Sequence, residues 1–414
     1  MNLLFINAYF SPEVIAFTHL EKDLIAALLA AGYPISVLCP TPTRGVDRET
    51  ERKYRAIKHE TMWDGGVTVR RFRAPAEGRN PLIRALRYLW CNLRQYQLGC
   101  RQMSADAVFG VSTPPTQGLL CALVAKRLSK KRGRKVPFIY NLQDVFPDSL
   151  VTTGLTKKGS LLWKIGRKIE DYTYAHADAI IVISESMKKN IMDKGVPEEK
   201  ITVVSNWIDT EATRPVPREE NRLFEEFSIE RDKFTVVYAG NFGKAQGAGA
   251  VLDAAERLAD EDVRFVIFGG GAEFEAAKTR VAENNLKNVT INPLLPADRV
   301  PEVYSLGDVA LITCKKGVGN SGMPSKTWSI MACDTPIIAA FDTESELADI
   351  LSRSGAGITV EPENAEALAE AILAMKRGER KVAGGRAYVC EHAEKKLCTA
   401  KYVEIIKNSV ENTK

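Results

Sequence analysis

Residues 321–340 read SGMPSKTWSIMACDTPIIAA, and this order of a turn, a helix start and an apolar strand is typical of an α/β fold. Pro324 suits the first position of the helix, Ser325 can cap it or bind an anion, and Lys326 adds a positive charge. The free N–H groups and the dipole of a helix N-terminus attract phosphate. The stretch therefore predicts an enzyme whose substrate carries a diphosphate.

The rest of the chain alternates strand and helix patterns in two successive halves. In the first half, strand patterns occur at 3–9, 34–39, 67–73, 107–111, 137–142, 179–183 and 201–204, and helical patterns at 20–31, 118–129 and from 186. In the second half, strand patterns occur at 235–238, 264–268, 289–291, 309–313 and 336–339, and helical patterns at 250–259, 273–284, 300–305, from 324, and at 365–375. This alternation favours two parallel, doubly wound sheets.

The alternation divides the chain into domains. We expect a Rossmann-like N-terminal domain at 1–205, a linker rich in charge and proline at 206–232, and a Rossmann-like C-terminal domain at 233–390. The segment 391–414 is expected to be a helix that packs back on the N-terminal domain. Ligands of such sheets bind beyond the carboxyl ends of the strands, so the active site is expected in a central cleft that the two domains face.

The composition is that of an ordinary globular protein without a metal centre. The 414 residues are 45% apolar and 26% charged, and the net charge of +5 is too small to indicate a nucleic-acid partner. The eight cysteines form no CxxC pair and no metal-like cluster with the four histidines, which predicts reduced thiols in a cytoplasmic protein. The N-terminal MNLLFINAYF reads as a strand rather than a signal peptide, and no apolar run is long enough to predict a membrane span.

Residues 80–101 form a pattern of another kind, a basic amphipathic helix without acidic residues. Such a helix suits an anionic membrane surface, but a helix packed on the core with solvated arginines explains it equally well. The basic run KRLSKKRGRK at 126–135 would add to an attraction for anionic lipid. The apolar face at helical spacing consists of Leu82, Ile83, Leu86, Leu89, Trp90, Leu93 and Tyr96.

Eight motifs, in their order and spacing, resemble the family 4 glycosyltransferases of bacterial surface-polysaccharide biosynthesis, which have the GT-B fold. They are YFSPE (9–13), NLQDVFPDS (141–149), HADAIIVISESM (176–187), ITVVSNWID (201–209), YAGNFGKAQG (238–247), FGGGAE (268–273), LGDVALI (306–312) and MPSKTWSIMACDTPIIA (323–339). The resemblance covers nearly the whole chain. It implies that the C-terminal domain binds a nucleotide-sugar donor and the N-terminal domain binds the acceptor.

The resemblance also implies roles for residues of the donor domain. Lys244 and Lys326 are expected to neutralise the departing diphosphate. The family often has an arginine and a lysine where this chain has Asn241 and Gln246, and two glutamates where it has Ser321 and Ser329. FGGGAE could hold the nucleotide base or form a plain turn, and Glu346 could bind a sugar or ribose hydroxyl or stabilise a helix start. The expected donor-binding set is Gly240, Asn241, Gly243, Gly270, Gly271, Ser321, Gly322, Met323, Pro324, Ser325, Ser329 and Glu346.

In the N-terminal domain, Asp144 follows a buried strand at the place where many family members have an important histidine. Its carboxylate could orient the acceptor hydroxyl or stabilise an oxocarbenium-like centre, so it is the third expected catalytic residue. Asp148 is better explained as a helix cap. Glu13 and His19, in and after the first strand-to-helix loop, are candidates for acceptor binding, although a lone histidine is more often structural or solvated.

The implied reaction moves a sugar from a nucleotide-diphosphate donor, expected to be UDP-linked, to a polyprenyl-diphosphate-linked saccharide, with retention of anomeric configuration. No cofactor or metal is expected, since lysines would supply the charge. A cytoplasmic enzyme is expected, with peripheral association at the inner face of the membrane through 80–101. Two alternatives are a sugar-nucleotide epimerase of the same fold and a non-catalytic GT-B-like binding protein that lost the paired glutamates.

Overall fold

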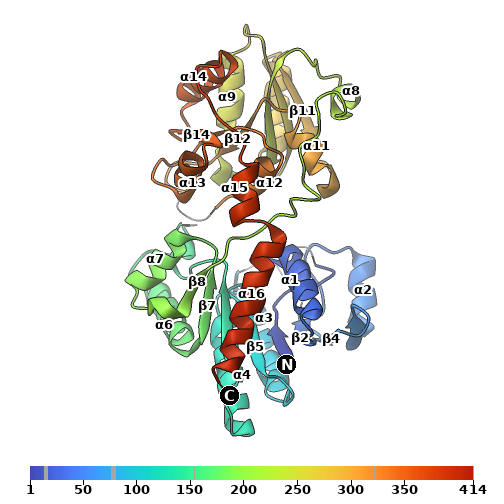
Figure 1. The fold of residues 1–414 in the computed structure, drawn as a ribbon, viewed down its shortest axis with the longest axis vertical. Coiled ribbons are helices and arrows are strands. Elements are labelled where there is room, and N and C mark those ends of the chain that lie inside the picture. Colours follow the sequence, from blue (N-terminus) through green and yellow to red (C-terminus); the bar gives the residue numbers. More distant parts are fainter. Residues whose placement is uncertain (14–16, 76–80, 153, 320–322, 414) are drawn as a thin grey trace. The chain divides into compact units, whose positions relative to one another are not determined.

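The computed structural model describes residues 1–13, 17–75, 81–152, 154–319 and 323–413. The chain forms two compact units: unit 1 comprises residues 1–206 and 396–414, and unit 2 comprises residues 207–395. Each unit is a parallel sheet covered by helices (Figure 1), so the predicted α/β class is confirmed. None of the helices in the described ranges combines the length and apolar character needed to cross a membrane.

Unit 1 contains an eight-stranded sheet in the order β3-β4-β2-β1-β5-β6-β7-β8, in which only β3 runs antiparallel to its neighbour. The strand order reverses between β1 and β5, so the loops after these two strands diverge and leave room for a ligand. The strands are β1 (Leu3–Ile6), β2 (Ile35–Pro40), β3 (His59–Met62), β4 (Val67–Phe72), β5 (Ala107–Val111), β6 (Phe138–Leu142), β7 (Ala179–Val182) and β8 (Ile201–Val203).

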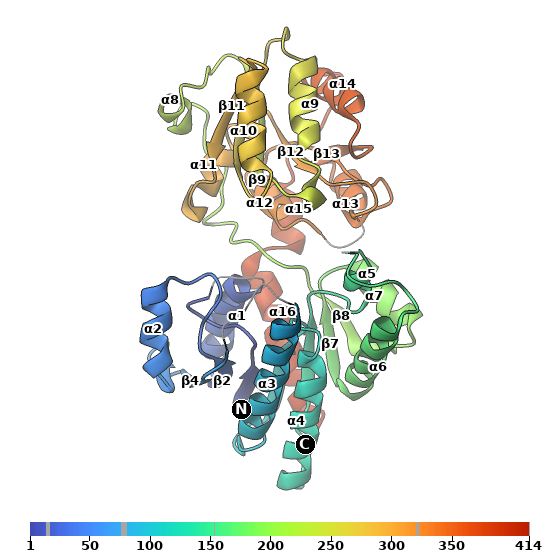
Figure 2. The same cartoon turned by 180° about the vertical axis from the view of Figure 1, so that it is seen from behind.

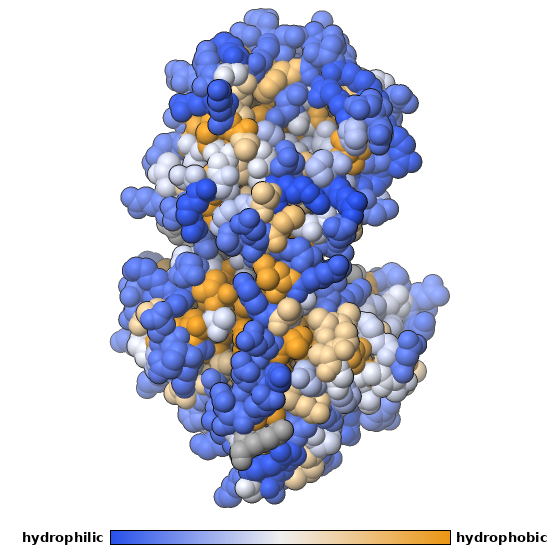
Figure 3. Space-filling model, viewed as in Figure 1, coloured by the Kyte–Doolittle hydropathy of each residue, from blue (hydrophilic) through white to orange (hydrophobic). Residues whose placement is uncertain are grey.

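The helices of unit 1 cover both faces of this sheet. In Figure 2, α3, α4 and α6 lie side by side on the near face with α4 in the middle. On the opposite face, α16 presents a hydrophilic outer surface (Figure 3). The helices are α1 (Thr18–Ala30), α2 (Arg48–Ala56), α3 (Pro81–Gly99), α4 (Gln117–Arg132), α5 (Asp148–Thr152), α6 (Leu161–His176), α7 (Glu185–Asp193), η1 (Glu198–Lys200) and α16 (Lys395–Glu411).

Unit 2 repeats the same design with a six-stranded, fully parallel sheet in the order β11-β10-β9-β12-β13-β14. Its strand order reverses between β9 and β12. The strands are β9 (Phe234–Asn241), β10 (Val263–Gly270), β11 (Val289–Pro293), β12 (Val309–Thr313), β13 (Ile337–Ala340) and β14 (Gly357–Val360). The helices are α8 (Leu223–Glu226), η2 (Lys244–Gln246), α9 (Gly249–Arg257), α10 (Phe274–Glu283), η3 (Ala297–Arg299), α11 (Val300–Tyr304), α12 (Lys326–Ala332), α13 (Glu346–Ser354), α14 (Ala365–Lys376) and α15 (Arg386–His392).

Two segments differ from the expected element boundaries. The helix predicted to start at Pro324 starts at Lys326, and Ser325 is its N-cap residue but makes no side-chain capping hydrogen bond. The segment 206–232, expected to be a linker, contains α8, whose Leu223 and Phe224 are buried in the core of unit 2. The high charge and proline content of this segment favoured a linker, so the sequence pattern did not predict that Leu223 and Phe224 would be buried.

The C-terminal helix α16 packs in unit 1. Tyr402 is fully buried, its hydroxyl donates to Asn141 Oδ1 on β6 at 3.1 Å, and its ring lies 6.4 Å from that of Phe109 on β5. The chain thus leaves unit 1 after residue 206 and returns to it at residue 396.

Candidate functional site

A cavity of about 560 Å³ in unit 2 lies at the carboxyl ends of the strands, where the strand order reverses. Gly240 and Asn241 end β9, Thr313 ends β12, and Phe341 follows β13. The wall beyond β10 and β11 is apolar. It consists of Phe268, Leu294, Leu295, Pro296, Val300, Val303 and Tyr304.

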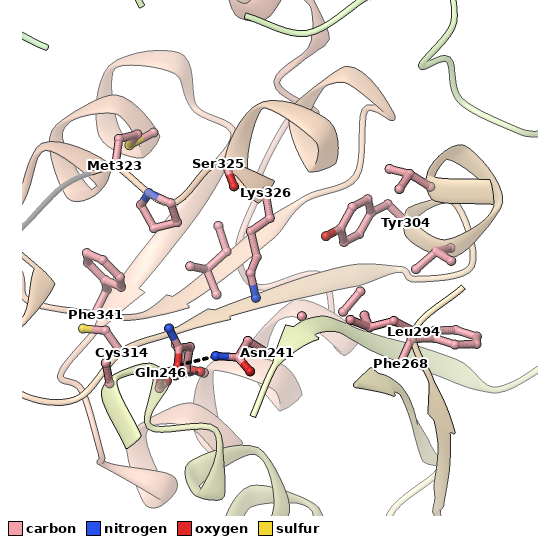
Figure 4. A pocket seen from close by; sticks show the side chains of 18 of the residues that line it. Asn241, Gln246, Phe268, Leu294, Tyr304, Cys314, Met323, Ser325, Lys326 and Phe341 are labelled. Carbon is pink, nitrogen blue, oxygen red and sulfur yellow. Dashed lines mark hydrogen bonds between the residues drawn. The ribbon is translucent and has the colours of Figure 1, made fainter. Parts of the chain in front are cut away.

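Lys326, the first residue of α12, points into this cavity (Figure 4). Its Nζ lies 4.3 Å from the centroid of the Tyr238 ring, and a Cβ added to Gly240 would lie 2.7 Å from that Nζ. Burial lowers the pKa of the ammonium to about 8. None of the ion pairs between the described residues involves Lys326, so its charge is left for an anion to neutralise.

Asn241 and Gln246 form a neutral pair across the glycine-rich loop, with Asn241 Nδ2 donating to Gln246 Oε1 at 3.2 Å (Figure 4). Two glycines make room for this pair. A Cβ on Gly243 would lie 2.8 Å from Asn241 Nδ2, and one on Gly271, whose φ is +115°, would lie 2.0 Å from Asn241 Oδ1. Because Asn241 and Gln246 are neutral, Lys326 is the one charged residue among the described residues that line the cavity.

Carboxylates outside the cavity fix the loop that follows β12. Asp342 accepts hydrogen bonds from the backbone N–H groups of Gly317 at 3.0 Å and Gly319 at 2.7 Å, and Glu363 accepts one from Lys316 at 3.0 Å. This loop precedes Met323, Pro324 and Ser325, which line the cavity. Sequence reasoning missed Asp342 and Glu363, because contacts across 20 to 50 residues leave no local pattern.

The structure brings together five of the twelve residues expected to bind the donor. Gly240, Asn241, Met323, Pro324 and Ser325 line the cavity with Lys326, whereas Gly270 ends β10 and Gly243 and Gly271 lie in the loops after β9 and β10. Ser329, within α12, and Glu346, which begins α13, are not among the lining residues. Neither is Lys244, expected to be catalytic, which is exposed on η2. Ser321 and Gly322 lie outside the described residues.

Asp144 lies at the carboxyl end of β6 in unit 1. Ser112 Oγ accepts from the backbone N–H of Asp144 at 3.1 Å, and Thr113 Oγ1 donates to its Oδ2 at 3.4 Å. The residue is exposed, but the surrounding protein partly desolvates the carboxyl and raises its pKa. Asp148, four residues further on, forms an ion pair with Lys194 at 2.9 Å.

Glu13 holds a loop in place. Its carboxylate is buried and accepts hydrogen bonds from the backbone N–H groups of Thr43 and Arg44, each at 2.9 Å, while desolvation raises its pKa. These bonds fix the loop after β2 to the loop after β1. His19, the other residue expected to contact the acceptor, is exposed in the first turn of α1.

Glu21 is a buried acid that sequence reasoning did not single out. It lies beside a small cavity at the carboxyl ends of β1 and β5, and its Oε1 accepts from Asn7 Nδ2 at 2.6 Å. Burial raises the pKa of this carboxyl to about 8. The available signal was its place in the apolar stripe of α1, at helical spacing from Leu24 and Leu28.

In the described ranges, no three His, Cys, Asp or Glu side chains are placed to share a metal ion.

Comparisons with known proteins agree with this arrangement. Residues 22–207 match the glycosyl transferase 4-like domain, and residues 219–389 match the glycosyl transferases group 1 domain. The chain is 28% identical over 303 residues to the glycosyltransferase named WbjE of Pseudomonas aeruginosa, covering 73% of this chain and 74% of WbjE. It is 25% identical over 379 residues to WcaI of Escherichia coli K12, named for colanic acid biosynthesis, covering 90% and 91% of the two chains.

Solved structures show the same fold. Sucrose-phosphate synthase from Thermosynechococcus elongatus superposes with a TM-score of 0.73 at 16% identity, over 98% of both chains. Anabaena HepE in complex with UDP superposes with a TM-score of 0.70 at 15% identity, over 99% of this chain and 100% of HepE. With both of its domains matched in order, this chain belongs to the family 4 glycosyltransferases of GT-B fold, and it is related to enzymes of surface-polysaccharide biosynthesis.

Proposed function

We propose that this glycosyltransferase moves a sugar from a UDP-sugar, bound in the cavity of unit 2, to a hydroxyl of a lipid-linked saccharide, with retention of anomeric configuration. The observation that carries the proposal is Lys326, which lies against Gly240 at the carboxyl end of β9 and is the one cation among the described residues that line the cavity, with no ion-pair partner among them. A diphosphate placed there would supply the anion that this ammonium lacks.

In the proposed reaction, the bond between the anomeric carbon and the β-phosphate oxygen breaks, and its electron pair leaves with UDP. The acceptor hydroxyl attacks from the face that UDP leaves, and its proton passes to the departing phosphate oxygen. The Lys326 ammonium stabilises the negative charge that develops on the diphosphate. Since a lysine supplies this charge, we expect transfer to need no metal ion.

The shape of the cavity suits a nucleoside next to this cation. Its apolar wall, with Phe268 and Tyr304, can cover a base and a ribose, while Asn241 and Gln246 can hydrogen-bond sugar hydroxyls. HepE, whose fold this chain shares, is described in complex with UDP and with UDP-glucose. These complexes of HepE support UDP as the first nucleotide to test.

Unit 1 is proposed to hold the acceptor, with Asp144 orienting its hydroxyl. Glu13 and His19 remain predicted acceptor contacts. A lipid-linked acceptor is supported by WcaI, named for colanic acid biosynthesis, and by a third relative that is 26% identical over 216 residues, covering 50% of this chain and 54% of that protein: alpha-galactosylglucosyldiacylglycerol synthase of Streptococcus pneumoniae. The enzyme would then act in the cytoplasm at the inner face of the membrane.

A donor screen tests the proposal. The purified enzyme is incubated with UDP-, GDP- and dTDP-sugars, with and without a polyprenyl-diphosphate-linked saccharide, while nucleotide release and thermal stabilisation are measured. We expect UDP-sugars to stabilise the protein and acceptor to accelerate UDP release. Binding without turnover on any acceptor would favour a non-catalytic protein, and interconversion of the donor without acceptor would favour an epimerase.

A further inference from the structure

Helix α3 packs on unit 1 with its apolar face toward solvent. Leu86 and Leu89 are each 67% exposed, whereas Arg87 and Gln95 on the opposite face are buried. Gln95 Nε2 donates to the carbonyl of Asn7 at 2.7 Å, and Arg87 donates to the carbonyl of Pro75. The polar residues thus anchor the helix to unit 1, which excludes the alternative that the leucine face packs on the core.

The neighbouring helices extend this apolar surface. Most large apolar side chains that the described part of the chain exposes come from α3, α4, α6 and the segment before α6, and the two exceptions are Met103 and Leu294. Because α4 packs against both α3 and α6, these side chains belong to one helical layer (Figure 2). We call this layer the α3–α4–α6 surface. Its exposed apolar members are Ile83, Leu86, Leu89, Trp90, Leu93, Leu123, Leu155, Leu161, Leu162 and Ile165.

The exposed apolar part of this layer carries cations only, and the acids of α6, Glu170 and Asp171, lie further along that helix, where both pair with Arg167. Residues 81–99, 117–132 and 154–168 contain no Asp or Glu. Their exposed cations surround the apolar side chains, with Trp90 and Arg94 in contact at 6.0 Å from ring centroid to guanidinium. The exposed cations include Arg84, Lys126, Arg127, Lys130, Lys157, Lys158, Lys164 and Lys168.

The direction of the helices places most of the apolar side chains at one end of the sheet. Helices α3, α4 and α6 follow β4, β5 and β6, so each begins at the carboxyl ends of the strands. Apart from Leu93, the exposed leucines lie in the first half of each helix or just before it, at the end of the sheet that carries Asp144. Met103, beyond the other end of α3, lies near the amino end of β5.

We infer that the α3–α4–α6 surface docks unit 1 on an anionic lipid bilayer, with the carboxyl-end loops next to the lipid head groups. Apolar side chains bordered by cations, with no Asp or Glu in residues 81–99, 117–132 and 154–168, match the apolar and anionic layers of such a bilayer. The inference deepens the proposed function, since a lipid-linked acceptor would enter unit 1 from this surface. The inference rests on the proposed function only for the identity of the acceptor.

Sedimentation with vesicles tests the surface without donor or acceptor, so its result is independent of whether transfer is ever detected. The full chain is mixed with vesicles of phosphatidylglycerol and phosphatidylcholine or of phosphatidylcholine alone. We expect binding to the anionic vesicles that weakens with added salt. Leu86→Glu/Leu89→Glu and Leu161→Glu/Leu162→Glu should each weaken it at least about tenfold, because they place charges where apolar side chains enter the lipid.

The control is Met103→Glu, which places a negative charge at an exposed apolar residue outside the surface and should bind as the wild type does. Thermal unfolding checks that all variants are folded. The inference is overturned if the wild type does not bind anionic vesicles, or if both double variants bind as tightly as Met103→Glu. It is also overturned if the wild type is a dimer in solution that Leu86→Glu/Leu89→Glu dissociates, because the surface would then join two copies of the chain.

Discussion

At the scale of the residue, the donor cavity depends on one lysine and the glycine beside it. Gly240 leaves the space that Lys326 Nζ occupies, and any larger residue there would push the ammonium away. The sequence indicated both residues through the glycine-rich loop and PSK. It could not show that Lys326, rather than the equally basic Lys244, would line the cavity, because that depends on where η2 and α12 lie in unit 2.

The lowered pKa of Lys326 predicts how UDP affinity depends on pH. The free enzyme loses this proton as pH rises through about 8, whereas bound diphosphate would keep the lysine charged. Binding then takes up a proton above pH 8, so affinity falls with rising pH, to about tenfold weaker at pH 9 than at pH 7. Calorimetric titration checks this, and Lys326→Met should bind weakly with a much flatter pH profile. Equal pH profiles for the two proteins would refute the role.

Asp144 offers a residue-scale prediction in unit 1. Asp144→Asn should lower kcat by about 10²-fold and leave the affinity for UDP unchanged, because the proposed carboxylate acts on the acceptor and not on the donor. Asp148→Asn is the control from the same segment, since Asp148 is paired with Lys194. Steady-state kinetics would contradict the assignment if both variants lost the same activity.

At the scale of the element, α3 shows which part of a structure sequence patterns can predict. The spacing of leucines correctly predicted an amphipathic helix, and the apolar runs at 107–111 and 309–313 gave the limits of β5 and β12, because buried parallel strands are apolar throughout. The pattern could not tell which face of α3 would be buried. That choice depends on the carbonyl oxygens of Asn7 and Leu38, which approach Gln95 from other strands.

Because α3 buries Gln95 and exposes its leucines, substitutions in it should change the free energy of unfolding in the opposite pattern to that of an ordinary amphipathic helix. Gln95→Leu should lower the free energy of unfolding by roughly 1–3 kcal/mol, because the two carbonyl groups would lose a buried donor. Leu86→Gln, on the exposed face, should change it by no more than about 0.5 kcal/mol. Urea denaturation of both variants measures the difference. A larger loss for Leu86→Gln would mean that the leucine face is the buried one.

At the scale of the whole molecule, the alternation of patterns predicted two doubly wound parallel sheets, and the structure has one in each unit. Several elements were not predicted, among them α2, α6 and β14. Helix α6 begins with exposed apolar residues, so its pattern does not mark a buried face, and β14 is a short strand of half-buried residues. What remained beyond prediction were contacts between distant segments, such as Asp342 with the loop after β12.

The return of the chain to unit 1 gives a prediction at this scale. Tyr402→Ala should destabilise unit 1 by about 3–5 kcal/mol, because it removes a buried ring and the hydrogen bond to Asn141. Hydrogen exchange should show faster exchange in β5 and β6 and unchanged exchange in β9 and β10. Faster exchange confined to unit 2 would mean that α16 belongs there instead.

Sugar transfer by a Lys326 variant tests the central claim most directly. The transfer of labelled sugar from a UDP-sugar to a lipid-linked saccharide is measured for the wild type, Lys326→Met and Lys287→Met, the last removing an exposed lysine of unit 2 outside the cavity. We predict transfer by the wild type and Lys287→Met, and a rate at least about 10²-fold lower for Lys326→Met. Transfer by Lys326→Met at the rate of the wild type would contradict the account.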